Sequence, residues 1–462
     1  MQIRYLTTYS LLGVLFLTAS CGQDEFGGDD YNSENGRIEF LAAMPQHTSR
    51  ATEISTSSLK NFEVSSFKIG SLSESLYFLN KSFVKNAVTG KFVSSDPECR
   101  WPNNNDLLRF LAFAPSCEDM RSAGNFGETD FSFPTLADGE GIAEGDYILS
   151  NFKVAQDIAS QIDFITAIAT GRLIDNDAEG VTLDFQHQLS RIELKAWGAS
   201  KSFDIEIAGV RLGGVSTQGV FSFTSVADAT DAAKAGSWLS AHKGNVEYIF
   251  RESDRIVTLD KSDDSPISAD KAVSILGANV GDGVGYENSA MVIPSNNAAW
   301  DYKDNAANGA DHIDDLFFSV LLRVKDTTPY DYGNLIYPYP DENDGMERVY
   351  FAVDKSSPDI VKTRVYRQGE AYFSDPDLTS VYDCEANNAE VKVFGWAALP
   401  VSAQWEPGHI YTYTLNYSDG VGLRDPRDPQ PGDPIINDRV LVNVTVAEWV
   451  TGSKTNVSVL RK

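Results

Sequence analysis

Cysteine is scarce in this sequence. Four cysteines occur in 462 residues, and Cys21 stands apart from the others near the start of the chain. The remaining three, Cys99, Cys117 and Cys384, allow one disulfide at most, which excludes a disulfide-dense scaffold. Cys99 and Cys117 are the closest pair and bracket an apolar strand. The sequence leaves open whether they form a bridge.

Positive charge is also scarce. The chain has 38 Lys and Arg against 66 Asp and Glu, which gives a formal net charge of −28. Phosphate binding needs a basic surface, so we do not expect nucleic acid as a partner. We interpret the acidity as a means of keeping a secreted protein soluble.

Sequence motifs of catalysis are missing as well. The five histidines form no HExxH motif, the cysteines lack zinc-binding spacing, and no GxSxG motif or phosphate-binding loop occurs. His187 alternates with Phe185 and Leu189, which favours a buried structural histidine. Acidic pairs such as Asp341 and Asp344 would suit hydrolysis or calcium binding, but in so acidic a chain we interpret them as surface groups. We therefore expect no enzyme activity, no metal site and no cofactor.

One short segment is rich in tyrosine. It reads PYDYGNLIYPYP and contains Tyr330, Tyr332, Tyr337 and Tyr339. Such rings would form a stacking platform for sugars, but we favour the interpretation that they cover an end or edge of a β-sandwich.

The start of the chain has the pattern of a secretory signal peptide. One basic residue, Arg4, precedes an apolar run at residues 11–17 and the small residues before Cys21. The run is too short to cross a bilayer core of about 30 Å as a helix. A cysteine after Ala-Ser resembles the lipobox of bacterial lipoproteins. We expect residues 1–20 to be the signal peptide and residues 21–36 to be a lipidated acidic tether, which resembles the export signal of surface-exposed outer-membrane lipoproteins of Bacteroidetes.

Alternating apolar residues predict β-strands along most of the mature chain. The segment RIEFLAAM, residues 37–44, places Ile38, Phe40, Ala42 and Met44 on one side. Similar short runs recur, with Gly, Asn and Asp between them. The chain is therefore predicted to be all-β and to form antiparallel β-sandwiches.

Turn-forming residues divide the chain into two strand-rich halves. The segment GRLIDNDAEG, residues 171–180, is polar and contains the residues that favour turns. We expect an N-terminal sandwich over residues 37–175 and a C-terminal sandwich with loop-rich insertions over residues 176–462. The clearest helical candidate, residues 152–169, is ambiguous between helix and strand.

Several segments, in this order, resemble the fimbrillin family, the lipoprotein pilin subunits of Bacteroidetes. They are the lipobox cysteine, SRATEI, LKNFEVSSFKIG, WPNNNDLLRFLAFAP, QIDFITAIA, VTLDFQHQLSRIELKAW, WEPGHIYTYTLNY and VNVTVAEW. The resemblance implies two tandem transthyretin-like Greek-key β-sandwich domains and a lipidated precursor. It also implies assembly outside the cell, with other fimbrial subunits, by donor-strand complementation.

In polymerising members of that family, a protease cuts after an Arg in the loop that follows the first strand. Arg50 matches this position, and a cut there would leave Ala51 as the new N-terminus; otherwise Arg50 is a solvated loop residue. Stripping off a strand with three buried apolar side chains would cost on the order of 5–9 kcal/mol. A whole domain is stable by only about 5–15 kcal/mol. The empty groove would therefore have to be refilled by an added strand.

The donor strand is left open. Val457 and Val459 in the segment TNVSVLRK would serve a neighbouring subunit, whereas the valines at positions 440–446 would instead complete the chain's own second sandwich. We favour a tip or stalk subunit over an anchor subunit, and the sequence leaves open which host or bacterial receptor or glycan is bound. The alternative function is a monomeric surface lipoprotein that binds carbohydrate.

Overall fold

The structure is a computed structural model in which nearly all regular structure is β-strand, so the expected all-β class is confirmed. It describes residues 36–44, 54–70, 74–122, 135–136, 147–198, 202–223, 236–259, 272–277, 286–303, 314–436, 440–449 and 454–455. The helices within these ranges are short: α1 (Cys117–Ser122), α2 (Leu173–Asn176), η1 (Ile158–Ser160) and η5 (Glu342–Asp344). None of these helices is long and apolar enough to cross a membrane.

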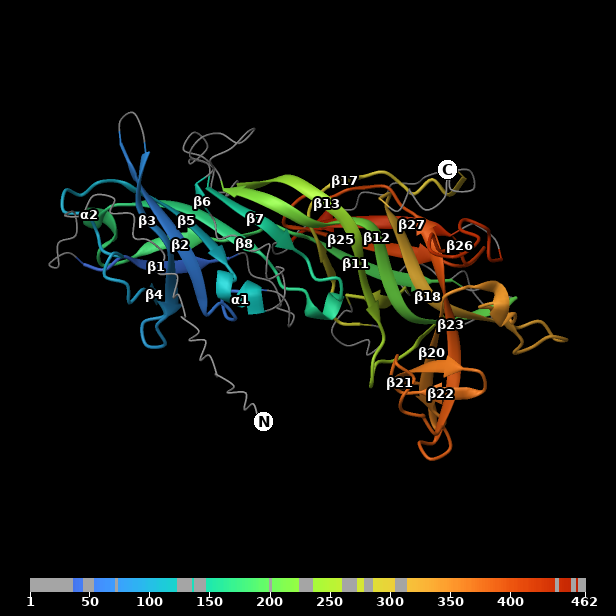
Figure 1. The fold of residues 1–462 in the computed structure, drawn as a ribbon. Helices are drawn as coiled ribbons and strands as arrows, with labels where there is room; N and C mark the ends of the chain where they lie inside the picture. Colours follow the sequence, from blue (N-terminus) through green and yellow to red (C-terminus); the bar gives the residue numbers. More distant parts are fainter. Residues whose placement is uncertain are drawn as a thin grey trace, which may run out of the picture.

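The first sheet occupies the N-terminal end of an elongated molecule (Figure 1). In spatial order its strands are β10 (Gln186–His187), β8 (Ile165–Gly171), β5 (Leu108–Ala114), β2 (Asn61–Ile69), β3 (Glu74–Lys85), β4 (Phe92–Val93), β1 (Glu39–Ala43) and β9 (Val181–Asp184). β9 at one end of this order also packs against β8 near the other end. The sheet therefore curls around one apolar core.

Two further sheets pack face to face in the C-terminal half. The second sheet contains β15 (Val273–Leu276), β11 (Ser190–Trp197), β25 (His409–Asn416), β27 (Leu441–Glu448) and β28 (Lys454–Thr455), with β16 (Ala290–Val292) beside β11. The third sheet runs β22 (Ala371–Phe373), β21 (Ser357–Gln368), β20 (Arg348–Asp354), β23 (Ala389–Pro400), β18 (Phe317–Asp326), β12 (Phe203–Phe223), β7 (Tyr147–Lys153) and β6 (Thr135–Leu136). Additional strands pair with β12, β18 or β23: β13 (Gly236–Ile249), β14 (Val257–Leu259), β19 (Leu335–Tyr337) and β26 (Leu423–Arg424). β17 (Asn296–Asn297) and β24 (Ala403–Gln404) form a small separate ladder.

The core of the C-terminal half lies between the second and third sheets. Phe318 of β18 meets Tyr413 of β25 with ring centroids 4.8 Å apart. Both residues belong to one large apolar cluster, together with buried residues of β11, β12 and β23. The half is therefore a sandwich, in agreement with the predicted fold class.

β5 separates the two cores. All of its residues are buried, and its alternation divides them between clusters. Phe110 and Ala112 face the core of the first sheet, whereas Leu111 and Phe113 face the core of the C-terminal half. Because successive side chains of a strand point to opposite faces, one strand contributes to both cores.

The boundary expected from the sequence at residue 175 does not separate the strands of the first sheet from those of the third sheet. β9 and β10 follow that position but pair in the first sheet, whereas β6 and β7 precede it but pair in the third sheet. The chain therefore crosses between the halves more than once. The division into domains at residues 37–175 and 176–462 stays a prediction.

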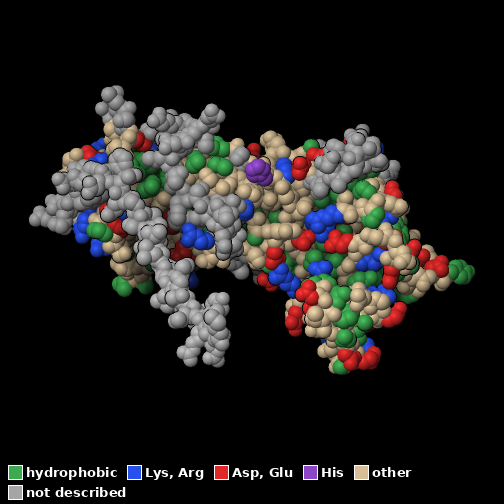
Figure 2. Space-filling view, viewed as in Figure 1, with side chains coloured by type: hydrophobic (Ala, Val, Ile, Leu, Met, Phe, Trp, Pro, Cys, Tyr) green, Lys and Arg blue, Asp and Glu red, His purple; other side chains and the backbone are tan. Residues whose placement is uncertain are grey.

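Part of the third sheet projects as an arm. β21, β22 and the outer parts of β20 and β23 extend away from the rest of the molecule (Figure 1). We call β21, β22 and these outer parts of β20 and β23 the arm. Figure 2 shows basic and acidic side chains interspersed over the C-terminal half on the face in view.

Two local expectations are resolved by the fold. Residues 152–169 are not a helix, because they hold the end of β7, the short η1 and the start of β8. Cys99 and Cys117 are both free and buried. Cys99 lies in the core of the first sheet and Cys117 in the other core, so the sheet stands between the two thiols.

Candidate functional site

The first strand, β1, is enclosed on both edges. It pairs antiparallel with β4 through Glu39 and Phe40, and parallel with β9 over residues 40–43. Backbone bonds hold its ends as well: the Ile38 amide donates to the Cys99 carbonyl at 3.1 Å, and the Phe185 amide donates to the Ala43 carbonyl at 2.9 Å. β1 is thus an interior strand of its sheet, although no other described strand precedes it in the chain.

The apolar side chains expected to face the core do so to different degrees. Ile38 and Phe40 are fully buried, Met44 is 9% exposed and Ala42 is partly buried. Leu41, on the opposite face, is 36% exposed. The alternation read from the sequence therefore corresponds to an inner and an outer face of β1.

Phe40 lies at the centre of an aromatic cluster. Its ring centroid is 4.8 Å from that of Phe83, 5.0 Å from that of Phe110 and 6.1 Å from that of Phe62, each in edge-to-face geometry. Edge-to-face pairs contribute about 0.5–1.5 kcal/mol each beyond the burial of area. Loss of β1 would leave these three rings facing an open slot between β4 and β9.

Gly180 allows the parallel contact between β1 and β9. Its φ of +84° lies in the left-handed region, and a Cβ placed there would come within 3.0 Å of the Glu39 carbonyl oxygen. A side chain at this position would be strained and would push β1 away. The sequence shows this residue only as one glycine in a turn-rich segment.

Charged contacts fix the outer side of β1. Glu39 forms an ion pair with Lys91 at 2.8 Å, and Lys91 also donates to the Ala178 carbonyl at 2.7 Å. The Arg37 guanidinium donates to the Ser94 carbonyl at 2.8 Å. These partly exposed contacts set the register of β1 and contribute modestly to stability.

Ile54, the first described residue after the expected cleavage position, is held by a hydrogen bond. The Ile54 amide donates to Oδ2 of Asp163 at 3.2 Å, and the Asp163 side chain is fully buried. Arg50 and Ala51 themselves lie outside the described residues. The expected lipidation residue Cys21 and the expected donor residues Val457 and Val459 also lie outside them.

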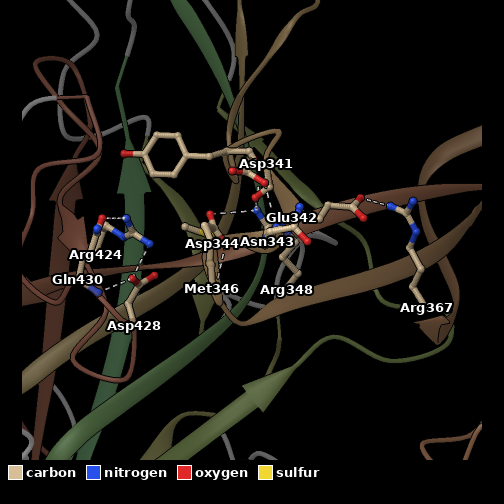
Figure 3. A network of polar contacts seen from close by, with 11 residues as sticks. Asp341, Glu342, Asn343, Asp344, Met346, Arg348, Arg367, Arg424, Asp428 and Gln430 are labelled. Carbon is tan, nitrogen blue, oxygen red and sulfur yellow. Dashed lines mark hydrogen bonds and ion pairs between the residues drawn. The ribbon is translucent and has the colours of Figure 1, made fainter. Parts of the chain in front are cut away.

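Acidic pairs elsewhere are engaged in local structure (Figure 3). Asp341 caps η5 by accepting from the Asn343 amide at 2.9 Å, and Asp344 accepts from Arg348 at 2.8 Å. Burial acts to raise the pKa of Asp344, but the hydrogen bonds from Arg348 and the Met346 amide, together with the charges of Arg348 and Arg424, outweigh it and hold that pKa below its usual range. Among the described residues, no group of three or more His, Cys, Asp or Glu is placed to hold a metal ion.

The four clustered tyrosines do not form a platform. Tyr337 is fully buried and donates to the Trp396 carbonyl at 2.6 Å, whereas Tyr330 is 97% exposed. Tyr332 is exposed and Tyr339 is half-buried against Tyr337. The rings therefore point into different environments.

Sequence reasoning missed the neighbours of β1. The strands that flank it, β4 and β9, are short and lie far along the chain. The sequence does contain one signal for the aromatic cluster around Phe40. The alternation in LKNFEVSSFKIG places Phe62 and Val64 on one side of β2, and both lie in the same core as Phe40.

Comparisons with known proteins give one family match and several similar solved structures. A family model described as fimbrillin-like matches residues 49–305. A fimbrial protein from Bacteroides vulgatus is similar in structure, with 12% identity, a TM-score of 0.45, and 90% of this chain and 100% of that chain covered. A candidate cell adhesion protein from Bacteroides ovatus has 12% identity and a TM-score of 0.39, with 91% and 99% covered. No curated protein matches the sequence.

Proposed function

The chain belongs to the fimbrillin-like family, and from this premise we propose that it is an adhesive subunit of a cell-surface fimbrium that assembles by exchange of its first strand. Membership of the family supports the structural and adhesive role. The exchange, the processing and the choice among stalk, tip and anchor go beyond it. We include no catalytic activity in the proposal.

The observation that supports exchange is the position of Phe40. Its fully buried side chain fills the centre of the aromatic cluster, and β1 lies between β4 and β9. Removing a strand from the edge of a sheet breaks one ladder, whereas removing β1 breaks two and opens the core. Only another strand with alternating apolar residues restores both the burial and the backbone hydrogen bonds.

The energetic argument is quantitative. Full burial of Ile38, Phe40 and Met44 contributes on the order of 1.5–3 kcal/mol each. Their combined loss approaches the roughly 5–15 kcal/mol that stabilise a typical domain. A subunit that has lost β1 is therefore unstable until a donor strand occupies the slot, and this makes assembly strongly favourable.

Processing would begin at the cell surface. In this proposal, a signal peptide directs secretion, lipid on Cys21 holds the precursor on the outer membrane, and a trypsin-like protease cuts between Arg50 and Ala51. The cut releases the lipidated segment together with β1. The contact from the Ile54 amide to Asp163 keeps the new N-terminal segment next to the body of the subunit.

The donor is the C-terminal segment of a neighbouring subunit. Val457 and Val459 alternate in the way that a slot lined by Phe62, Phe83 and Phe110 requires. A subunit that gives and accepts a strand would belong to the stalk, and one that only accepts would belong to the tip.

N-terminal sequencing of the protein taken from assembled fimbriae tests the proposal. We expect a start at Ala51 and multimers that resist SDS. Arg50→Ala should retain the lipidated N-terminus and remain monomeric, whereas Arg172→Ala, a change at an exposed arginine of another loop, should be processed normally. Assembled subunits that still begin at a blocked Cys21 would overturn strand exchange and favour the anchor or the monomeric lipoprotein.

A peptide competition provides an independent test. A synthetic peptide with residues 37–44 should occupy the slot of cut subunits and reduce multimer formation. The same peptide with Phe40→Asp should not compete, because it would bury a carboxylate among three phenyl rings. Equal competition by both peptides would contradict the role assigned to Phe40.

A further inference from the structure

A polar cavity of about 560 Å³ opens at the base of the arm. Its walls come from three distant parts of the chain: Gln156 and Asp157 before η1, residues 247–252 at the end of β13, and Thr363 and Arg364 of β21. None of these residues belongs to the first sheet. The volume falls within the roughly 300–1,000 Å³ of typical small-ligand sites.

One side of the cavity is fixed by paired charges. Arg251 forms an ion pair with Asp157 at 2.6 Å and lies over the ring of Tyr248, 5.3 Å from its centroid. Burial acts to raise the pKa of Asp157, but the hydrogen bonds from Arg251, Ser160 and the Ala159 amide, together with the charge of Arg251, outweigh it and lower that pKa. Glu247 is paired with Arg211 at 2.8 Å. Asp157, Arg251 and Glu247 therefore each have a charged partner within the chain.

The other side offers groups that are not engaged. Among the described residues, no hydrogen bond or ion pair is found for the side chains of Gln156 and Glu252, and none for the guanidinium of Arg364. The Arg364 guanidinium lies over the Tyr366 ring, 5.1 Å from its centroid. The stacking presents its donors in a fixed plane. Gln156 and Glu252 are solvent-exposed and Arg364 is partly buried, so the rim of the cavity holds an amide, a carboxylate and a guanidinium that are free to accept or donate.

This mixture of groups indicates the class of ligand. An anion or a cation would need charges of one sign, but the unengaged pair Glu252 and Arg364 is balanced. A hydroxyl group both donates and accepts, so a row of hydroxyls would satisfy the carboxylate, the amide and the guanidinium at the same time. Ile249, which is partly buried, adds an apolar part to the wall, which suits the C–H face of a sugar ring.

A peptide strand fits this place less well. Extended peptides bind by adding to an unpaired strand edge. β21 is paired with β20 on one side, and on the other side with β22 and with the turn at residues 253–256. The Ser253 amide donates to the Val361 carbonyl at 2.8 Å, and Tyr366 pairs with Phe373 of β22. The unpaired stretch of edge around Thr363 and Arg364 is therefore too short for an added strand.

We propose that this cavity binds a neutral oligosaccharide, with Gln156, Glu252 and Arg364 contacting its hydroxyl groups. This inference rests on the proposed adhesive function and names the class of ligand that the subunit would bind. It is separate from β1, so binding does not depend on strand exchange.

Calorimetric titration of the full chain tests the site with four neutral trisaccharides: maltotriose, cellotriose, mannotriose and N,N′,N″-triacetylchitotriose. We expect saturable binding of at least one of them. Arg364→Ala and Glu252→Gln should each weaken that binding about tenfold or more, since each removes hydrogen bonds to a charged group. Arg255→Ala, a change at an exposed arginine of the adjoining turn that pairs with Asp359 outside the cavity, is the matched control and should bind as the wild type does.

The outcomes separate this site from strand exchange. Failure of all four trisaccharides, or equal binding by the wild type and both cavity variants, would overturn the proposal. So would binding of only the acidic 3′-sialyllactose or of only a peptide. If Arg364→Ala loses the sugar but still forms SDS-resistant multimers, the cavity and the assembly function are both supported. If sugar binding persists while assembly fails, only the assembly proposal is lost.

Discussion

The imidazole of His187 stacks flat on the indole of Trp449, with ring centroids 4.0 Å apart and planes 2° apart. His187 belongs to the first sheet, and Trp449 directly follows β27 of the second sheet. Nδ1 of His187 lies 2.8 Å from Oδ2 of Asp163, which also accepts from the Ile54 amide. The contacts among Asp163, His187 and Trp449 therefore connect Ile54, the first sheet and the end of β27.

Trp449→Ala should loosen β27. The change removes a side chain that is 1% exposed, and loss of a buried aromatic ring costs about 3–5 kcal/mol. Hydrogen exchange should show faster exchange of the β27 amides and a smaller effect on β5. Trp449→Phe keeps a flat ring and should lose less. Unchanged exchange in β27 would mean that the stack does not hold that strand.

Phe40→Ala and Leu41→Ala should differ sharply, because adjacent residues of β1 face opposite sides. Phe40 is fully buried and its truncation should cost about 3–5 kcal/mol of the free energy of unfolding. Leu41 is 36% exposed, and its change should stay within about 0.5–1 kcal/mol. Denaturant unfolding of the uncut chain measures both. Similar losses for the two variants would contradict the assigned inner face.

Glu63→Gln should stabilise the protein more at neutral pH than at acidic pH. Burial raises the pKa of Glu63, and the hydrogen bond from the Cys117 amide offsets this only in part. The folded state therefore holds its proton above the unfolded pKa of about 4.3. The wild type loses stability as pH rises from that value through the folded pKa, whereas glutamine has no proton to lose.

Thermal unfolding at several pH values between about 4 and 7 checks this prediction. The melting temperature of the Gln variant relative to the wild type should rise with pH over that interval. Asp359→Asn removes an exposed carboxylate of the Arg255 pair and serves as the control, with little change. A difference that falls with rising pH would show that Glu63 is stabilised as a carboxylate.

Thiol labelling should distinguish the three cysteines outside the N-terminal tether. Burial raises the pKa of Cys99 to about 12 and also raises that of Cys117, so both resist labelling in the folded state. Cys384 is only partly buried and should react first. Cys384→Ser should abolish the early phase of labelling. The extent to which Cys99 and Cys117 are labelled after denaturation should not change. Mass spectrometry should find no Cys99–Cys117 bridge.

Local patterns in the sequence predict β1 well and its surroundings poorly. The alternation in RIEFLAAM predicts a strand with Ile38 and Phe40 inward, and the structure has that strand with both residues buried. The exchange of this strand stays a prediction. The partner β9 begins at residue 181, and no local pattern indicates a parallel pairing across such a separation.

Other features could not be predicted from the sequence, because they depend on which apolar core each face of a strand packs against. LRFLAFA is apolar throughout, so its alternation does not reveal that β5 serves two cores. Cys99 and Cys117 lie before and after this strand along the chain, yet they belong to the cores on opposite sides of the sheet. The cavity at the base of the arm combines three segments far apart in the sequence, and none of them carries a recognisable binding motif alone.

The place of β1 in the chain differs from its place in space. In space it is surrounded, but along the chain a single covalent connection joins it to the later strands that enclose it. Hydrolysis of one peptide bond after Met44 is therefore enough to detach it, and every remaining strand keeps its connections. An interior strand such as β5 would need two such breaks, and the chain on either side would then be divided.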